Sequence, residues 1–408
     1  MTDQQASRPL AGIRVLDLTQ MAAGPFATML FADAGAEIIK VERPDKGDLM
    51  REFGPFLPAD AEHAFGGGFL RHNRNKRSMT LNLRSPGGQA LFRELVRHAD
   101  VVWENFAPGT MEKFGLGYEH LREINPRLVY AAISGYGHTD ILASPFWRRP
   151  AFDGIAQALG GLVDITGQPG GPPTLVGTIV GDIVPGLFCA YGVLVALRGR
   201  ELTGRGQLVD VAMVDSMVSL CERLLMTYSM TKEVPPRGQD NLAAPYGVFP
   251  CKDGYVVITA APHGVWTRLC QVMGREDLIT DPRTATAAAR AVNSASYLTP
   301  IIVDWLKDKT KAEVDAVFAE GDVPGSPVLT IPEVFDSPHV AARQMLLEYN
   351  HPVLGKLKVA GNPVKLSELP TPPAELPPRL GEHTDEVLRD LLGFDAARVA
   401  ALRAEGVI

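Results

Sequence analysis

Asp182 is the residue of this chain whose position best suits covalent chemistry. It stands in the segment Gly181-Asp182-Ile183-Val184-Pro185-Gly186, after a glycine- and proline-rich stretch (167–173) and before an apolar run (187–197). That pattern predicts that a loop becomes a helix at Asp182, with small neighbours that leave its carboxylate accessible. A carboxylate in such a place either caps the helix or acts as a nucleophile beside free backbone N–H groups. Residue preference alone favours the cap.

Polar residues at three other places are weaker candidates for a site. Asp153, preceded by Phe152 and followed by Gly154, is a second possible helix cap, and Asn105 begins a bend, 105–109, after an apolar segment. The densest basic run, 71–77, is either a solvated loop or a phosphate site. The nine histidines do not cluster, so no metal site is predicted. Those expected in loops or at the surface are His63, His72, His138 and His263.

Composition limits the classes of protein to consider. A chain of 408 residues favours two domains, and a net charge of −7 disfavours a nucleic-acid or anionic-membrane partner. The signatures G-x-x-x-x-G-K-[ST], H-E-x-x-H and G-x-S-x-G do not occur. The first strand is followed by residues 20–25 without the pattern G-x-G-x-x-G, which argues against a plain nicotinamide dehydrogenase.

The cysteines and the apolar segments predict a cytoplasmic protein. The four cysteines form no C-x-x-C pair and are expected to be reduced thiols, three of them buried. The N-terminal residues 1–7 lack the charged and apolar regions of a signal peptide. The longest apolar run, 183–197, is interrupted by proline and glycine and is shorter than the roughly 18 residues of a membrane-spanning helix.

The elements that must position Asp182 alternate between strand and helix. Strands are expected at 13–18, 37–42, 101–104, 128–133 and 207–211, and helices at 26–34, 87–98, 118–124 and 214–230. Such alternation predicts an α/β fold with a doubly wound, parallel, Rossmann-like sheet. The loops at the carboxyl ends of these strands should converge on one crevice. They carry Arg43, Asn105 and Tyr136, which suit a ligand with phosphates and a flat ring.

A second, smaller α+β domain is expected in the middle of the chain. Pro235-Pro236-Arg237-Gly238 marks a linker, and Asp253-Gly254 predicts the turn of a hairpin over 248–258. A proline-rich segment leads from Pro324 towards a closing helix at 384–392. The predicted division is therefore a large domain (1–225), a small domain (226–328) and a return segment (329–408) that completes the large domain.

Ten motifs occur in a fixed order along nearly the whole chain: 9–17, Gly24-Pro25, 34–42, 75–78, 104–109, 135–137, 153–158, Gly181-Asp182, 203–207 and 380–387. In this order they resemble the motifs of family III CoA-transferases. The resemblance implies dimers whose chains pass through one another like linked rings.

The resemblance also implies a reaction. Such enzymes move coenzyme A (CoA) from an acyl-CoA to a small carboxylic acid, and the aspartate of their Gly-Asp element matches Asp182. Asp182 would form an acyl–aspartyl anhydride and then an aspartyl–CoA thioester. The acyl-CoA is a substrate, and no tightly bound cofactor or metal is implied.

The residues matched to CoA contacts lie mainly at the strand ends. They are Ala22, Ala23, Arg43, Leu81, Asn82, Leu83, Arg84, Asn105, Phe106, Ala107, Lys113 and Asp153, the last of these near the reacting carboxyl. The chain departs from the formate–oxalate branch, where a glutamine precedes the position of Ala22 and a glycine run forms a lid. Here the lid position is 239–245, which puts formate and oxalate in doubt. If the acid is dicarboxylic, Arg148 and Arg149 are candidate carboxylate binders, with an exposed loop pair as the alternative.

Three other functions remain open from the sequence. An α-methylacyl-CoA racemase shares the fold, but it needs a histidine where this chain has Phe152. A CoA-binding protein without turnover would use Asp182 only as a cap. A nucleotide-dependent oxidoreductase is opposed by the missing glycine fingerprint.

Overall fold

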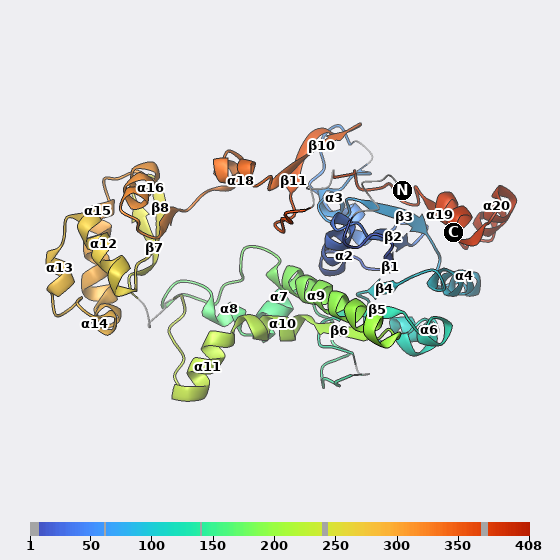
Figure 1. Cartoon of the computed structure of the whole chain (residues 1–408), viewed down its shortest axis with the longest axis horizontal. Helices are drawn as coiled ribbons and strands as arrows, with labels where there is room; N and C mark the ends of the chain where they lie inside the picture. The colour runs from blue at the N-terminus through green and yellow to red at the C-terminus, as the bar shows by residue number, and fades with distance from the viewer. Residues whose placement is uncertain (1–7, 61–62, 139–140, 239–243, 369–373) are drawn as a thin grey trace. The chain divides into compact units, whose positions relative to one another are not determined.

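The chain forms two compact units (Figure 1). The computed structural model describes residues 8–60, 63–138, 141–238, 244–368 and 374–408. Unit 1 comprises Met1–Leu162, Leu175–Cys221 and Ala342–Ile408, and unit 2 comprises Val163–Thr174 and Glu222–Ala341. The larger unit thus takes both ends of the chain, and a short segment before Asp182 belongs to the smaller one. That the large domain binds CoA remains a prediction.

A six-stranded sheet forms the centre of unit 1. Its order is β3-β2-β1-β4-β5-β6 and every neighbouring pair is parallel, which confirms the doubly wound class predicted from the sequence. This order places the switch point between β1 and β4, where ligands bind in such sheets. The strands are β1 (Arg14–Asp17), β2 (Glu37–Glu42), β3 (Lys76–Thr80), β4 (Val101–Glu104), β5 (Val129–Ser134) and β6 (Leu208–Ala212).

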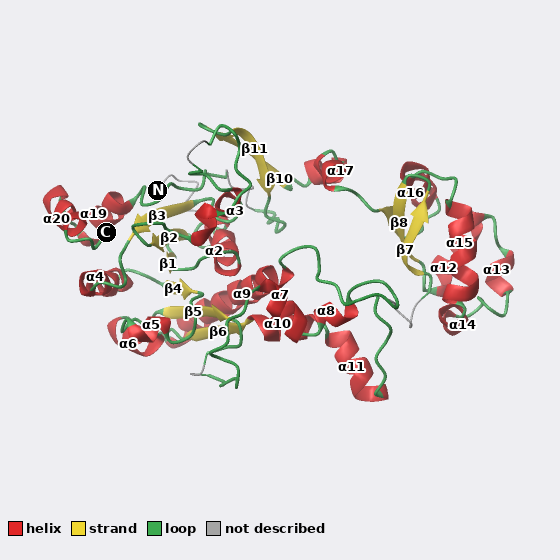
Figure 2. Cartoon of the chain, turned by 180° about the vertical axis from the view of Figure 1, so that it is seen from behind, coloured by secondary structure: helices red, strands yellow, loops and turns green. Residues whose placement is uncertain are grey.

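Helices cover both faces of this sheet (Figure 2). Alternate strand residues point to opposite faces: Leu16 packs with α4, α6, α19 and α20, whereas Val15 packs with α2, α9 and α10. The helices up to β6 are α2 (Ala23–Asp33), η1 (Leu49–Glu52), α3 (Gly67–Leu70), α4 (Pro86–Val96), α5 (Thr110–Lys113), α6 (Tyr118–Ile124), α7 (Asp153–Leu159), α8 (Leu162–Ile165) and α9 (Val180–Thr203). Those after it are α10 (Met213–Leu220), α11 (Glu222–Thr231), α12 (His263–Met273), α13 (Asp277–Thr280), α14 (Ala287–Val292), η2 (Ser294–Leu298), α15 (Thr299–Leu306), α16 (Lys311–Glu320), α17 (Ile331–Phe335), α18 (Pro338–Ala342), α19 (Thr384–Leu392) and α20 (Ala396–Ala404).

The long helix α9 includes the proline and glycine residues that interrupt the apolar run 183–197. It has 24 residues with Pro185 in its second turn, and it packs on α2, β5 and β6. Close packing explains one of its glycines, since a Cβ on Gly186 would lie 2.6 Å from the carbonyl oxygen of Ala23. By length and composition α9 is the one described helix that could cross a membrane, a property it shares with core helices of water-soluble proteins. It is also the helix that carries Asp182.

The outer edge of β3 is covered by the end of the chain. The Ser78 N–H donates to His383 Nδ1 (3.2 Å), and the His383 N–H donates to the Ser78 carbonyl (2.8 Å). Thr384 accepts from the Thr80 N–H at 3.0 Å. These bonds occupy main-chain groups that an edge strand would otherwise leave open.

Unit 2 has its own sheet and core. Strands β7 (Tyr246–Cys251), β8 (Gly254–Thr259) and β9 (Gly325–Pro327) pair antiparallel. The predicted hairpin is present, but its turn is Lys252-Asp253, one residue before the expected Asp253-Gly254, because Gly254 already pairs with Cys251. Their apolar face packs on α12, α15 and α16 around Trp266. A separate hairpin, β10 (Leu346–His351) and β11 (Gly355–Ala360), lies in unit 1 and was not predicted.

Candidate active site

Asp182 lies in the first turn of α9 but does not cap it. The helix begins at Val180 with Ile179 as its N-cap, and no side chain bonds to the helix from that position. No described residue donates a hydrogen bond to the Asp182 carboxylate, which is half-buried. The capping role favoured by residue preference is therefore wrong, and the carboxylate is left available for another role.

Asp153 holds the start of α9 instead. Its Oδ1 accepts from the Gly181 N–H at 2.7 Å, and both its oxygens accept from Gln157 Nε2 at 2.9 Å. Gln157 Oε1 in turn accepts from the Val176 N–H at 3.0 Å, which fixes the loop before the helix. A Cβ on Gly181 would lie 2.6 Å from the Asp153 carbonyl oxygen, so only glycine allows this approach.

The free N–H groups expected beside Asp182 are not found. The Gly181 N–H donates to Asp153, and the N–H groups of Asp182 and Ile183 both donate to the Ile179 carbonyl at 3.1 and 3.0 Å. An oxyanion formed on Asp182 therefore needs a different donor. The positive charge that acts on Asp182 is that of Arg71, the residue after α3.

The environment of Asp182 makes its carboxylate more basic than usual. Burial, and to a smaller extent repulsion from Asp153, raise the pKa of Asp182 to about 6 against the opposing effect of Arg71. A carboxyl group with this pKa is mostly ionised at neutral pH and is more nucleophilic than an ordinary aspartate.

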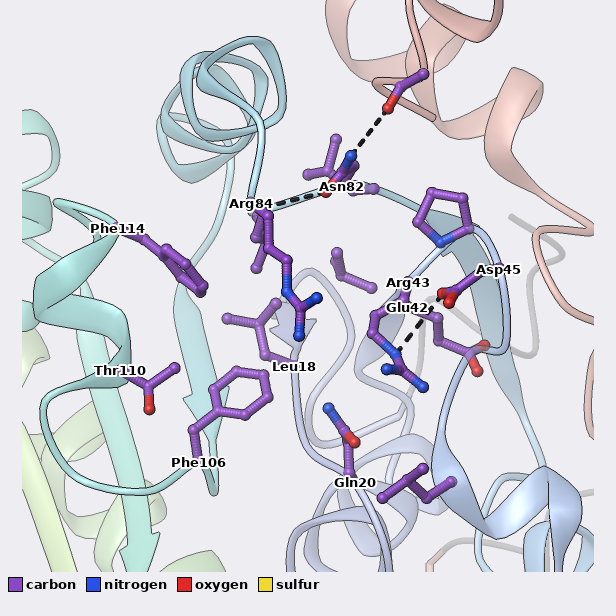
Figure 3. A pocket seen from close by; sticks show the side chains of 16 residues that line it. Leu18, Gln20, Glu42, Arg43, Asp45, Asn82, Arg84, Phe106, Thr110 and Phe114 are labelled. Atoms are coloured by element: carbon purple, nitrogen blue, oxygen red, sulfur yellow. Dashed lines mark hydrogen bonds and ion pairs between the residues drawn. The ribbon is translucent and has the colours of Figure 1, made fainter. Parts of the chain in front are cut away.

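A cavity of about 540 Å³ opens at the carboxyl ends of β1 to β4 (Figure 3). Arg43 follows β2 and Arg84 follows β3, and both guanidinium groups extend into the cavity. Arg43 Nε and Nη2 are buried without a hydrogen bond to any described residue, and Nε forms only a long ion pair of 3.8 Å with Asp45. Two cations at the edge of a parallel sheet suit a phosphorylated ligand.

The cavity brings together about half of the residues matched to CoA contacts. Six of them line it, and Phe106 and Phe114 add aromatic surface. The sequence analysis did not name Gln20, Thr110 or Phe114, although each lies in or just after a loop that was expected to converge. The six matched residues are Arg43, Leu81, Asn82, Leu83, Arg84 and Phe106.

The other matched residues do not line this cavity. Asn105 exchanges two hydrogen bonds of 2.8 Å with the main chain of Gln20, so it shapes the wall. Ala22 and Ala23 are buried at the start of α2, whereas Ala107 and Lys113 are exposed. Tyr136 is buried against Phe146, and Arg148 and Arg149 stack on Trp147 and Phe146. The expected lid, 239–245, lies largely outside the described residues.

The segment between β1 and α2 links the cavity to the helix that carries Asp182. Gln20 lines the cavity, and three residues later Ala23 contacts Gly186, one helical turn beyond Asp182. Movement of the start of α2 would therefore disturb both places.

A cluster of buried ion pairs holds the segment between β1 and α2 in place. Lys76 Nζ lies 3.1 Å from Asp17 Oδ2 and donates to the Pro25 carbonyl, while Lys40 Nζ lies 2.9 Å from Asp48 Oδ2 and donates to the Thr19 carbonyl. Thus Lys40 and Lys76, both buried, bond to the two ends of the β1–α2 turn. The basic run 71–77 is in part this cluster, not only a solvated loop. His72 and His138, expected at the surface or in loops, are buried.

Comparison with known proteins supports a CoA-dependent transferase. The chain is 46% identical over 389 residues to the succinyl-CoA:mesaconate CoA-transferase of Haloarcula marismortui, covering 95% of this chain and 97% of that protein. It is 40% identical over 414 residues to the succinyl-CoA–D-citramalate CoA-transferase of Chloroflexus aurantiacus, covering 100% of both. A CaiB/BaiF family protein from Brucella suis superposes with a TM-score of 0.82 at 34% identity, covering 94% of this chain and 99% of that one.

The family assignment agrees with the arrangement described above. Residues 10–384 match the family model described as CoA-transferase family III, a span that includes the six-stranded sheet, Asp182 and every lining residue of the cavity except Gly406. With that match and relatives that align along their whole length, the chain belongs to CoA-transferase family III.

Proposed function

We propose that this chain transfers CoA from an acyl-CoA to a free carboxylic acid with Asp182 as the nucleophile. The observation that carries the proposal is the Asp182 carboxylate, which is half-buried, uncapped and free of hydrogen bonds from described residues. Asp153 takes the structural role at the helix start, so Asp182 is available to react.

The reaction conserves the thioester through four displacements. Asp182 Oδ attacks the acyl carbonyl, the C–S bond breaks, and an acyl–aspartyl anhydride and CoA thiolate form. The thiolate attacks the Asp182 carbonyl, breaking the anhydride C–O bond and releasing the donor acid. The acceptor carboxylate attacks the resulting aspartyl–CoA thioester, and the released thiolate attacks the new acyl carbonyl. This regenerates the Asp182 carboxylate, and no ATP is needed.

The cavity at the strand ends is the proposed site for the nucleotide part of CoA. Arg43 and Arg84 supply positive charge for phosphates, and Phe106 and Phe114 supply aromatic surface for the adenine. The pantetheine arm would then follow the β1–α2 loop towards Asp182. Water has to be kept from the anhydride, because hydrolysis would destroy the activated acyl group.

The acids are proposed to be short dicarboxylates, with succinyl-CoA as donor. The names of the two relatives above support this, since succinate, mesaconate and citramalate are all dicarboxylic acids. Reaction in the cytoplasm is part of the same proposal, supported by four cysteines that are all free thiols.

A homodimer is proposed from the surface of α9. An apolar stripe at helical spacing is exposed on it, which a partner chain would cover. Light scattering on the purified protein should give the dimer mass, and Tyr191→Glu should shift it towards the monomer. The stripe comprises Leu187 (46% exposed), Tyr191 (68%), Leu194 (45%) and Val195 (50%).

Intact-protein mass spectrometry with succinyl-CoA and hydroxylamine tests the mechanism. A hydroxamate at Asp182 is expected, and Asp182→Ala should abolish both the adduct and transfer while CoA still binds. Asp215→Ala is the matched control, because Asp215 is an exposed aspartate in the first turn of α10. An adduct elsewhere, or substantial transfer by Asp182→Ala, would refute the mechanism. Exchange of the α-proton without an adduct would favour a racemase, and CoA binding with neither signal a non-catalytic protein.

A further inference from the structure

A second cavity in unit 1 lies next to the nucleophile. It has a volume of about 450 Å³, with mostly apolar walls from α2, α3 and β11. Two of its lining residues connect it to the first two turns of α9. Arg71 acts electrostatically on the Asp182 carboxylate, and the ring of Phe26 would lie 3.4 Å from a Cβ on Gly186, one turn further along α9.

The two arginines of this cavity differ in what they bind, and Lys358 is a third, exposed cation on its β11 wall. Arg74 is already neutralised, since its Nε and Nη2 donate to the two oxygens of Asp33 at 2.8 and 2.7 Å. The Arg71 guanidinium makes no hydrogen bond to any described residue and is exposed. It is therefore a cation without a bonded partner, at the end of an apolar cavity, beside the reacting carboxylate.

An unpartnered polar atom stands beside Arg71. His72 is only 7% exposed, and its Nδ1 is buried without a hydrogen-bond partner among the described residues. Burial and the charges of Arg71, Lys76 and Arg74 lower the pKa of His72 to about 3, so the ring is neutral at physiological pH. A neutral imidazole can form a hydrogen bond with a ligand without adding charge. A buried polar atom without a partner normally indicates a missing ligand or water.

We propose that Arg71 determines the specificity of this transferase for dicarboxylic acids. The acid lies at the Arg71 end of the 450 Å³ cavity, its far carboxylate binds the Arg71 guanidinium, and its other carboxyl group meets Asp182. His72 contributes a hydrogen bond at the wall. The inference rests on the proposed transfer reaction and adds the residue and the cavity that select the acid.

The physical basis is a contact that Arg71 can form with one acid and not with the other. A dicarboxylate gives the guanidinium a charge-assisted, bidentate partner. A monocarboxylate of equal length puts a methyl group in the same place and provides no partner. The site should therefore distinguish the two acids mainly through this one contact.

The test compares ¹³C-labelled succinate with butyrate as acceptors, at one fixed saturating concentration of unlabelled succinyl-CoA. Transfer to succinate is measured as the initial rate of labelled succinyl-CoA formation, because unlabelled succinate would give a product identical to the donor. The readout is the ratio of the two kcat/KM values, in which any effect on the donor cancels. The unmodified protein should prefer succinate, and Arg71→Gln should reduce the ratio roughly ten- to hundredfold. Arg71→Lys should keep part of the preference, because lysine retains the charge but not the bidentate geometry.

The matched control is Arg77→Gln in the same basic run. Its guanidinium lies 2.6 Å from Glu37 and 3.0 Å from Glu386, and it does not line the cavity, so the ratio should not change. An unchanged ratio in Arg71→Gln, or a loss of equal size in Arg77→Gln, would overturn the proposal. So would equal use of succinate and butyrate by the unmodified protein.

Hydroxylamine trapping distinguishes this failure from failure of the mechanism. If Asp182 of Arg71→Gln still forms the hydroxamate while its preference is unchanged, the transfer mechanism stands and the role of Arg71 is refuted. If the unmodified protein forms no adduct, the mechanism and this inference both fall.

Discussion

The raised pKa of Asp182 predicts that removing its charge stabilises the protein. Asp182→Asn keeps the shape of the side chain but is neutral at every pH. In the folded chain the pKa of Asp182 rises from 3.8 to about 6, chiefly through burial. At 1.36 kcal/mol per pKa unit, the ionised group costs up to about 3 kcal/mol of unfolding free energy at neutral pH. Because the side chain is only half-buried, about 1.5–3 kcal/mol is expected.

The pH dependence of this difference has a definite sign. Below pH 3.8 Asp182 is protonated in the folded and unfolded states, so it contributes nothing. As the pH rises towards 6 the unfolded chain ionises first and the folded state loses stability; above pH 6 the loss is constant. The gain in Asp182→Asn should thus be complete at pH 7.5 and about half as large at about pH 5.

Urea unfolding at the two pH values measures the difference. Because the chain has two units, peptide-level hydrogen exchange in β4 and β5 should identify the transition of unit 1. Asp215→Asn, an exposed aspartate, serves as the control and should change little. An Asp182→Asn protein no more stable than the unmodified one at pH 7.5, or a gain that does not shrink at pH 5, would refute the account of a buried, costly carboxylate.

Three further predictions concern activity. The rate of transfer should decrease as the pH is lowered through about 6, because Asp182 reacts only when it is ionised. Asp153→Asn should lower the midpoint of this pH–rate profile, because it removes a charge that repels the Asp182 carboxylate. An unchanged midpoint in Asp153→Asn would contradict this. Arg43→Ala should raise the KM for acyl-CoA roughly tenfold with little change in kcat, and the reverse pattern in steady-state kinetics would exclude a ground-state phosphate contact. Gly181→Ala should lower kcat roughly a hundredfold, since its Cβ would lie 2.6 Å from the Asp153 carbonyl oxygen. In Gly154→Ala the nearest atom is 3.7 Å away, so equal losses in the two variants would rule out this steric cause.

The sequence predicted the fold of unit 1 where each element had a clear hydrophobic pattern. Five of the six strands were expected close to their observed positions, and β4 (Val101–Glu104) matched at both ends. The missing strand is β3, whose sequence Lys-Arg-Ser-Met-Thr has no such pattern because Lys76 and Ser78 are buried through polar contacts. Burial through ion pairs leaves no trace in hydrophobic periodicity.

The sequence indicated several residues of the candidate site but not the contacts between them. Strand-end loops and the family resemblance identified Asp182, Arg43 and Arg84. The role of Asp153 depends on a contact with Gly181, 28 residues away. The prediction of free N–H groups beside Asp182 was wrong because this contact occupies the Gly181 N–H and the Ile179 carbonyl accepts from the N–H groups of Asp182 and Ile183. Arg71 gave no signal beyond its basic run, since its meaning depends on the distant segments that form the cavity.

The hydrogen bonds between β3 and the C-terminal segment affect how the chain folds during synthesis. The main-chain groups of Ser78 on the outer edge of β3 stay unpaired until His383, 305 residues further along the chain, has been synthesised. At about 5–20 residues per second, a ribosome needs roughly 15–60 s to make that interval. During this time β3 is an exposed edge strand that can pair with other nascent chains. Unit 2 is contained within that interval, so it can fold before unit 1 is complete.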